Sequence, residues 1–203
     1  MLTDIARIAV LVSGGGTNLQ ALIDAEHSGI IKSGKITLVL SNKPGAYALE
    51  RAAKAGIRTE TVLKKEVPDF EGKLIEVLDG DGIDLIILAG FMSILSERFT
   101  NHYKDRIINV HPSLIPSFCG EGFYGLRVHQ AALDYGVKVT GATVHFVNEI
   151  PDGGKIIMQK AVEIQPDDTP EILQKRVMEQ AEWIILPQSA EKVCNNIITE
   201  ANK

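Results

Sequence analysis

Cysteine and aromatic residues are scarce in this chain. Its 203 residues include one tryptophan and two cysteines, Cys119 and Cys194, far apart in the sequence. Two such cysteines exclude a disulfide framework and a cysteine-based zinc site, and they are typical of proteins in a reducing compartment. No HExxH pattern or other ligand spacing is present, so the sequence predicts no metal.

The sequence also lacks a long hydrophobic run and an excess of positive charge. No apolar stretch reaches the roughly 18 residues of a membrane span, and the start, with Asp4, lacks the pattern of a signal peptide. Asp and Glu total 26 against 21 Lys and Arg, which argues against a nucleic-acid or membrane partner. We expect a cytoplasmic protein, a monomer or weak homodimer, that binds small molecules.

Strand-like apolar runs alternate with helical patterns in the first half of the chain. The expected strands are 7–13, 35–42, 59–63, 84–91 and 106–110. The expected helices are 18–27, 46–56, 69–79 and 96–103, with Thr17 and Ser96 as the N-caps of the first and the last. Strands that alternate with helices predict a doubly wound, mostly parallel, Rossmann-like α/β sheet.

The pattern changes after residue 110. Residues 111–125 hold two prolines and three glycines and predict an irregular loop, followed by a helix at 126–136. Two strands, 139–147 and 155–164, joined by a turn, predict an antiparallel C-terminal extension of the sheet. Residues 168–201 supply one or two closing helices. With no repeat or linker, residues 1–203 are expected to form a single domain.

The segment SGGGTN (13–18) follows the first strand and leads into a helix. Glycines let the backbone approach an anion, and a helix N-terminus offers free N–H groups, so a phosphate site is one interpretation. A plain strand-to-helix turn is the other. The segment is not a Walker A loop, and no acidic residue ends the second strand, which argues against a nicotinamide dinucleotide.

The segment NVHPS (109–113) puts an amide and an imidazole at the end of the fifth strand. Because side chains alternate along a strand, Asn109 and His111 share one face. An amide can stabilise a developing oxyanion, and an imidazole can do so or move a proton. The alternative is a core histidine beside an asparagine that ends the strand.

Asp152 lies in the glycine-rich turn NEIPDGG (148–154). Asp-Gly is a common turn pair, so a structural role is one interpretation. A carboxylate close to His111 would orient the imidazole and raise its basicity, which is the functional interpretation. His145, in the middle of the sixth strand, is expected to be a supporting polar residue or a satisfied core group.

Together these segments resemble the folate-dependent phosphoribosylglycinamide formyltransferases of the formyltransferase superfamily. The resemblance rests on SGGGTNLQALI (13–23), LAGFMSIL (88–95), INVHPSLIPSF (108–118), VHFVNEIPDGGKII (144–157) and AEWIILP (181–187), in order along nearly the whole chain. It implies transfer of the formyl group of 10-formyltetrahydrofolate to the amine of N1-(5-phospho-D-ribosyl)glycinamide, in purine biosynthesis. It also implies a nucleotide-binding half, 1–110, and a folate-binding and closing half, 111–203.

The resemblance also implies the roles of single residues. Asn109 and protonated His111 stabilise the tetrahedral oxyanion, and Asp152 holds His111 and helps to pass the amine proton, through water, to N10 of the folate. The implied contacts to the nucleotide are Gly15, Gly16, Thr17, Asn18 and Glu182. The implied contacts to the folate are Met92, Ser93, Ile94, Leu95, Asn109, Asn148, Glu149, Ile150, Pro151 and Asp152.

Four features depart from the family pattern. Ser93 stands where many members carry Arg, and the short segment 64–72 lacks their folate-tail Arg, which leaves Lys64 and Lys65 as candidates. The segment 117–133 is longer than usual, and only His129 matches within it. Trp183 replaces a usual histidine, and one additional residue precedes Glu182.

Other activities remain open. A related formyltransferase would act on another amine, such as that of a sugar nucleotide, and a formyltetrahydrofolate hydrolase shares the same core. A non-catalytic α/β ligand-binding protein would keep the phosphate loop. Such a protein has no need for Asn109, His111 and Asp152 together, so the trio favours an enzyme.

Overall fold

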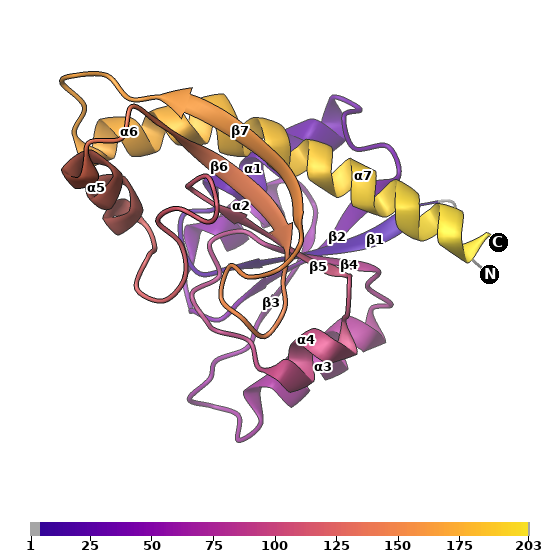
Figure 1. Ribbon diagram of the computed structural model, residues 1–203. Coiled ribbons are helices and arrows are strands. Elements are labelled where there is room, and N and C mark those ends of the chain that lie inside the picture. Colours follow the sequence, from indigo (N-terminus) through magenta and orange to yellow (C-terminus); the bar gives the residue numbers. More distant parts are fainter. Residues whose placement is uncertain (1–4, 203) are drawn as a thin grey trace.

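The computed structural model describes residues 5–202, which form a three-layer α/β structure (Figure 1). Residues 1–4, with the Asp4 considered above, and residue 203 lie outside the described part. The strands are β1 (Ala6–Val12), β2 (Gly34–Ser41), β3 (Arg58–Thr61), β4 (Leu85–Leu88), β5 (Ile107–His111), β6 (Val139–Phe146) and β7 (Ile156–Glu163). The helices are α1 (Thr17–His27), α2 (Tyr47–Lys54), α3 (Phe70–Gly80), α4 (Glu97–His102), α5 (Leu126–Tyr135), α6 (Pro170–Val177), the π turn η1 (Met178–Glu182) and α7 (Trp183–Ala201).

The sheet has the strand order β3-β2-β1-β4-β5-β6-β7. Strands β1 to β5 pair in parallel, whereas β6 is antiparallel to both of its neighbours. The predicted doubly wound sheet with an antiparallel extension is therefore confirmed. The chain builds β1 to β3 on one side and returns to β4 on the other, so the topological switch point lies between β1 and β4. Ligands of such sheets bind beyond the carboxyl ends of the strands at this point.

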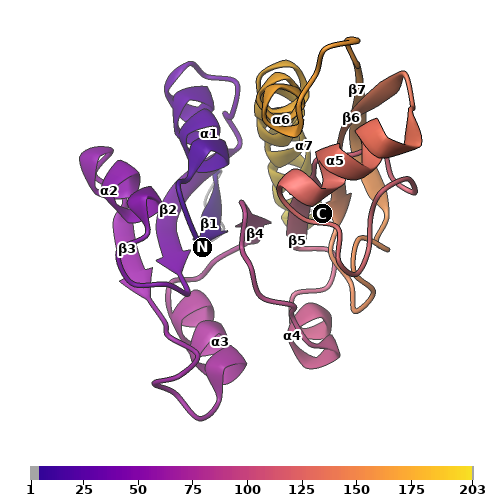
Figure 2. The same cartoon turned by 90° about the vertical axis from the view of Figure 1, so that its left-hand side faces the viewer.

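Helices cover both faces of the sheet, with α1, α2, α6 and α7 on one face and α3 and α4 on the other (Figure 2). The central strand β1 is apolar on both sides because it contributes to both cores. Ile8 and Val10 pack under the first group of helices, and Ala9 and Leu11 pack against the second. Among the described residues, no helix is both long and apolar enough to cross a bilayer.

The starts of two helices show how the loops at the carboxyl edge are shaped. Ser96 caps α4 as expected, because its hydroxyl accepts the N–H of Phe99. The expectation that Thr17 caps α1 is wrong: Thr17 is the first helical residue, and Gly16 takes the N-cap position with a φ of 72°. A Cβ on Gly16 would lie 2.6 Å from the Cβ of Ala48. Glycine at this position therefore permits both the left-handed backbone and the close approach of α2.

Glu182 is the last residue of the π turn η1. A π turn closes i to i+5 hydrogen bonds and so contains one residue more than an α turn. The helices on either side are anchored separately, α6 through the guanidinium of Arg176 on Asp168, and α7 through Glu191. The π turn therefore lies between two anchored segments, and the side chain of Glu182 is directed at α1.

Glu191 on α7 binds the segment that follows α1. Its carboxylate accepts the backbone N–H groups of Lys32 and Ser33 at 2.7 and 2.8 Å and the hydroxyl of Ser33 at 2.8 Å. Burial raises the pKa of this carboxyl, but the hydrogen bonds outweigh burial and hold the pKa below its ordinary value.

We expect Glu191→Ala to lower the free energy of unfolding by about 1–2 kcal/mol at neutral pH, because charge-assisted hydrogen bonds are lost at a partly exposed site. The depressed pKa means that wild type loses this contribution as the pH falls through the folded-state value. The difference between the two proteins should therefore shrink in acid. Urea unfolding at several pH values measures it, and identical midpoints at neutral pH would contradict the prediction.

Candidate active site

A cavity of about 150 Å³ opens at the carboxyl edge of the sheet, beyond β4 and β5. Its lining residues are Leu88, Phe91, Ser93, Ile94, Leu95, Asn109, His145, Val147, Asn148, Glu149, Ile150, Pro151 and Asp152. All the residues predicted to contact folate are in this lining except Met92, whose side chain is exposed. Segments far apart in the sequence thus converge on one cavity.

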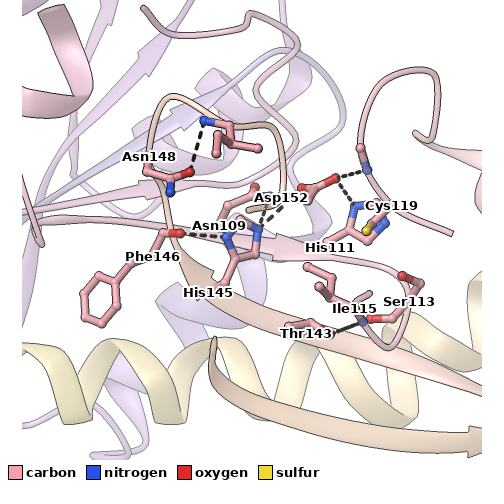
Figure 3. Close-up of polar contacts among 12 residues, drawn as sticks. Asn109, His111, Ser113, Ile115, Cys119, Thr143, His145, Phe146, Asn148 and Asp152 are labelled. Atoms are coloured by element: carbon pink, nitrogen blue, oxygen red, sulfur yellow. Dashed lines mark hydrogen bonds and ion pairs between the residues drawn. The ribbon is translucent and has the colours of Figure 1, made fainter. Parts of the chain in front are cut away.

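Asp152 lies between two imidazoles (Figure 3). Its Oδ2 is 3.4 Å from Nδ1 of His111, and its Oδ1 is 3.4 Å from Nε2 of His145. The N–H of Gly120 donates to Oδ2 at 2.9 Å. The predicted approach of Asp152 to His111 is therefore present in the structure.

The backbone of the turn explains how Asp152 reaches this position. Its φ is 55°, a left-handed conformation that aspartate tolerates better than most residues. A Cβ on Gly154 would lie 1.8 Å from the carbonyl oxygen of Phe146, and one on Gly153 would lie 2.6 Å from the side chain of Ile150. The two glycines after Asp152 are thus required by a turn that closes tightly on β6.

The electrostatics of the cluster keep Asp152 ionised. Burial raises its pKa, but the hydrogen bond from His145, the charge of His111 and the Gly120 N–H together lower the pKa below its ordinary value. For His111, burial lowers the pKa and outweighs the opposing effect of Asp152. At neutral pH the aspartate is therefore ionised, and its negative charge lies beside both imidazoles.

Each ring nitrogen of His111 already has a polar neighbour. Nδ1 faces Asp152, and Nε2 donates to the carbonyl oxygen of Phe118 at 2.8 Å. His111 is 4% exposed and is not among the residues that line the cavity. An N–H of this imidazole becomes available to a substrate atom once the contact with Phe118 is released.

Asn109 and His145 face the cavity directly. Nδ2 of Asn109 is 3.3 Å from Nε2 of His145, whose Nδ1 donates to the carbonyl of Phe146 at 2.7 Å. The sequence indicated only a supporting or core role for His145. The signal that was missing is the register of β5 and β6, which sets Asn109 opposite His145 in the antiparallel pair.

The nucleotide loop lies on the other side of the switch point. Nδ2 of Asn18 donates to Oε2 of Glu182 at 2.7 Å, and the hydroxyl of Thr17 points at the sulfur of Met178, 3.8 Å away. Oδ1 of Asn18 is buried and has no hydrogen-bond partner among the described residues. The loop before it is open, because a Cβ on Gly15 would meet nothing within 4 Å. The predicted residues Gly15, Gly16, Thr17, Asn18 and Glu182 are thus brought together.

Glu182 is buried, with 6% of its surface exposed. Burial raises its pKa to about 7, against the opposing effect of the hydrogen bond from Asn18.

His129, in the segment 117–133, is fully buried, and burial lowers its pKa to about 4. Within the described residues no group of three or more His, Cys, Asp or Glu side chains has the geometry of a metal site.

Comparisons with known proteins identify the family of this chain. The family model described as Formyl transferase matches residues 6–189. The chain belongs to the formyl transferase family. The resemblance inferred from the sequence motifs is therefore confirmed.

Three members of the formyl transferase family illustrate the relationship. Phosphoribosylglycinamide formyltransferase of Haemophilus influenzae is 45% identical over 187 residues, 89% of this chain and 84% of that protein. The enzyme of the same name from Escherichia coli is 42% identical over 85% of this chain and 80% of its own length. The crystal structure of glycinamide ribonucleotide transformylase 1 from Symbiobacterium toebii has a TM-score of 0.89 and 38% identity, covering 96% of this chain and 90% of that chain.

The buried carboxyl of Glu182 makes the stability of the protein depend on pH. Its pKa is about 7 in the folded state against an ordinary value of 4.5, so the folded state binds more protons between these values. The free energy of unfolding therefore falls as the pH rises through this range. We expect Glu182→Gln, which keeps an acceptor for Asn18 but cannot ionise, to lose less stability than wild type between about pH 5 and pH 8. Equal losses in denaturant titrations would contradict this.

Proposed function

We propose that this protein transfers the formyl group of 10-formyltetrahydrofolate to the primary amine of N1-(5-phospho-D-ribosyl)glycinamide. The products are formylglycinamide ribonucleotide and tetrahydrofolate, and the reaction belongs to purine biosynthesis. The observation that carries the proposal is the Asn109, His111 and Asp152 cluster beside the switch-point cavity, in a chain 45% identical to a phosphoribosylglycinamide formyltransferase. We place the reaction in the cytoplasm and expect small molecules as partners of a monomer or weak homodimer.

The nucleotide would bind at the start of α1. Free backbone N–H groups and the positive end of the helix dipole at Gly16 and Thr17 suit the phosphate. The unpartnered Oδ1 of Asn18 and the carboxylate of Glu182 are acceptors for ribose hydroxyls. Residues 1–110 would thus supply most of the nucleotide subsite, and Glu182 would complete it from the closing half.

The folate would bind in the cavity beyond β4 and β5. The apolar side chains of Leu88, Phe91 and Leu95 offer faces for a planar ring system, and the backbone of 148–152 offers polar groups at its edge. This mixture of apolar walls and a few polar groups fits the pterin of a folate. Residues 111–203 would close the cavity through the turn that carries Asp152.

The chemistry follows from the position of the cluster. Attack of the substrate amine on the formyl carbon places negative charge on the formyl oxygen and positive charge on the amine nitrogen. Asn109 donates a hydrogen bond to the oxyanion, and His111 donates a second after it exchanges the carbonyl of Phe118 for the substrate. Asp152 stabilises the imidazolium and, through water, helps the amine proton to reach N10, which leaves as the carbon–nitrogen bond breaks.

A second cavity continues from the folate site. It measures about 250 Å³, shares Ser93 and Ile94 with the first, and is lined by Lys64 but not by Lys65. Its two acids already have partners, because Asp69 pairs with Arg98 and Glu71 accepts from Ser96. Lys64 forms no ion pair within the described residues. We therefore assign to Lys64 the contact with the carboxylates of the folate tail.

We expect Asn109→Ala and His111→Ala each to lower turnover by about 10²–10³, the effect of removing one oxyanion donor. The assay follows release of the deformylated cofactor from 10-formyl-5,8-dideazafolate with the ribonucleotide as acceptor. Asn101→Ala, an exposed asparagine on α4, is the matched control. Full activity of both active-site variants would overturn the catalytic roles. Turnover of wild type without the ribonucleotide would indicate a formyltetrahydrofolate hydrolase. Turnover only with an amino sugar nucleotide would indicate a sugar-nucleotide formyltransferase.

We expect Lys64→Ala to raise the KM for the glutamate-bearing cofactor by about 3- to 10-fold, the effect of losing one hydrogen bond at an exposed site. The KM for an analogue that lacks the glutamate should not change. Lys65→Ala is the matched control because its side chain is exposed and does not line the cavity. An equal effect of Lys64→Ala on both cofactors would contradict the assignment.

A further inference from the structure

The side chain of Asn42 bridges two segments that the proposed reaction uses. Asn42 follows β2, one strand away from the switch point. Its Oδ1 accepts the hydroxyl of Ser13 at 2.6 Å, and its Nδ2 donates to the hydroxyl oxygen of Ser93 at 2.8 Å. The hydroxyl of Ser13 in turn accepts the backbone N–H of Met92 at 2.8 Å. Four groups thus form one hydrogen-bonded chain.

This hydrogen-bonded chain connects two subsites, because it begins and ends in the loop after β4 and passes through Ser13 and Asn42. Ser13 is buried at the end of β1 and directly precedes the glycines of the nucleotide loop. Met92 and Ser93 follow β4, and Ser93 lines both the folate cavity and the cavity of Lys64. The strands β1 and β4 are neighbours, so the amide of Asn42 joins the two loops across the crevice between them.

The direction of the protons follows from the chemistry of the groups. A backbone N–H only donates, so Ser13 accepts from Met92 and gives its own proton to Oδ1 of Asn42. Nδ2 of the amide only donates, so Ser93 accepts from it and keeps its own proton free. Because Ser93 lines the folate cavity, its hydroxyl is left as a donor for a ligand there.

The position of Asn42 is itself held by the turn around it. The hydroxyl of the fully buried Ser41 accepts the N–H of Lys43 at 3.0 Å and donates to the carbonyl of Lys43 at 2.8 Å. These two bonds fix the backbone on either side of Asn42. The side-chain amide of Asn42 is in turn hydrogen-bonded at both of its ends, to Ser13 and to Ser93.

We propose that Asn42 is a positioning residue that couples the nucleotide and folate subsites, so that binding of one substrate strengthens binding of the other. The coupling rests on the proposed function for the identity of the two ligands. A nucleotide that orders the loop after β1 also orders Met92 and Ser93, because Ser13 is hydrogen-bonded to Met92 directly and to Ser93 through Asn42. The folate then loses less conformational entropy of the protein when it binds. Thermodynamic linkage requires the effect to be reciprocal.

The test measures ligand binding as well as turnover. Binding of 5,8-dideazafolate, which has no formyl group to transfer, is titrated by calorimetry with and without the ribonucleotide, for wild type, Asn42→Ala, Ser93→Ala and the double variant. Lys43→Ala is the matched control, because its exposed side chain neighbours Asn42 without joining the chain. Thermal unfolding of each variant records any purely structural effect.

We expect the nucleotide to tighten folate binding in wild type and in Lys43→Ala, and to tighten it about 3- to 10-fold less in Asn42→Ala, the effect of one or two hydrogen bonds. The KM for the formyl folate should rise while kcat changes little. The nucleotide should tighten folate binding in the double variant to the same extent as in Asn42→Ala, because both changes break the same chain. A lower unfolding temperature with unchanged coupling would show a merely structural role and overturn the inference. Absence of formyl transfer by wild type would instead overturn the proposed function, while the binding titrations would still test the coupling.

Discussion

The partly buried carboxylate of Asp152 is the group on which the geometry of the site depends. A negative charge in this position is tolerated because two imidazoles and the Gly120 N–H surround it. The same contacts connect three segments of the chain, namely the end of β5, the strand β6 and the loop before α5. Removal of the carboxylate would leave His111 and His145 without a common partner, so orientation and charge are supplied by one residue.

The switch point places the two halves of the proposed reaction side by side. Formyl transfer requires the attacking amine and the formyl carbon to meet, and the loops after β1 and β4 lie next to each other because these strands pair. Asn109 and Asp152 flank the cavity from β5 and from the turn after β6. The antiparallel extension therefore does more than enlarge the sheet, because it returns the chain to the carboxyl edge with an acid at its tip.

Two segments expected to depart from the family pattern are held by local hydrogen bonds. The π turn that ends at Glu182 lies between two helices with separate anchors, and the carboxyl of Glu182 meets Asn18. The hydroxyl of Ser93 is hydrogen-bonded to Asn42. In both places the surrounding hydrogen bonds determine where the side chain lies.

Much of this protein follows from its sequence, because strand and helix patterns are local. Alternation of apolar runs and helical patterns predicted the seven strands and the helices α1 to α5, and it put Asn109 and His111 at the end of β5. The closing segment was predicted only as one or two helices, without the π turn between α6 and α7. The role of His145 was not predictable, since it depends on the register between β5 and β6, a contact between residues far apart in the chain. The hydrogen bond from His111 to the carbonyl of Phe118 and the bridge that Asn42 makes between Ser13 and Ser93 are likewise tertiary contacts that the sequence did not predict. The sequence by itself determined which residues carry the chemistry, and the tertiary structure alone decided which of them touch, because hydrogen bonds between distant segments form only once the sheet has set their register.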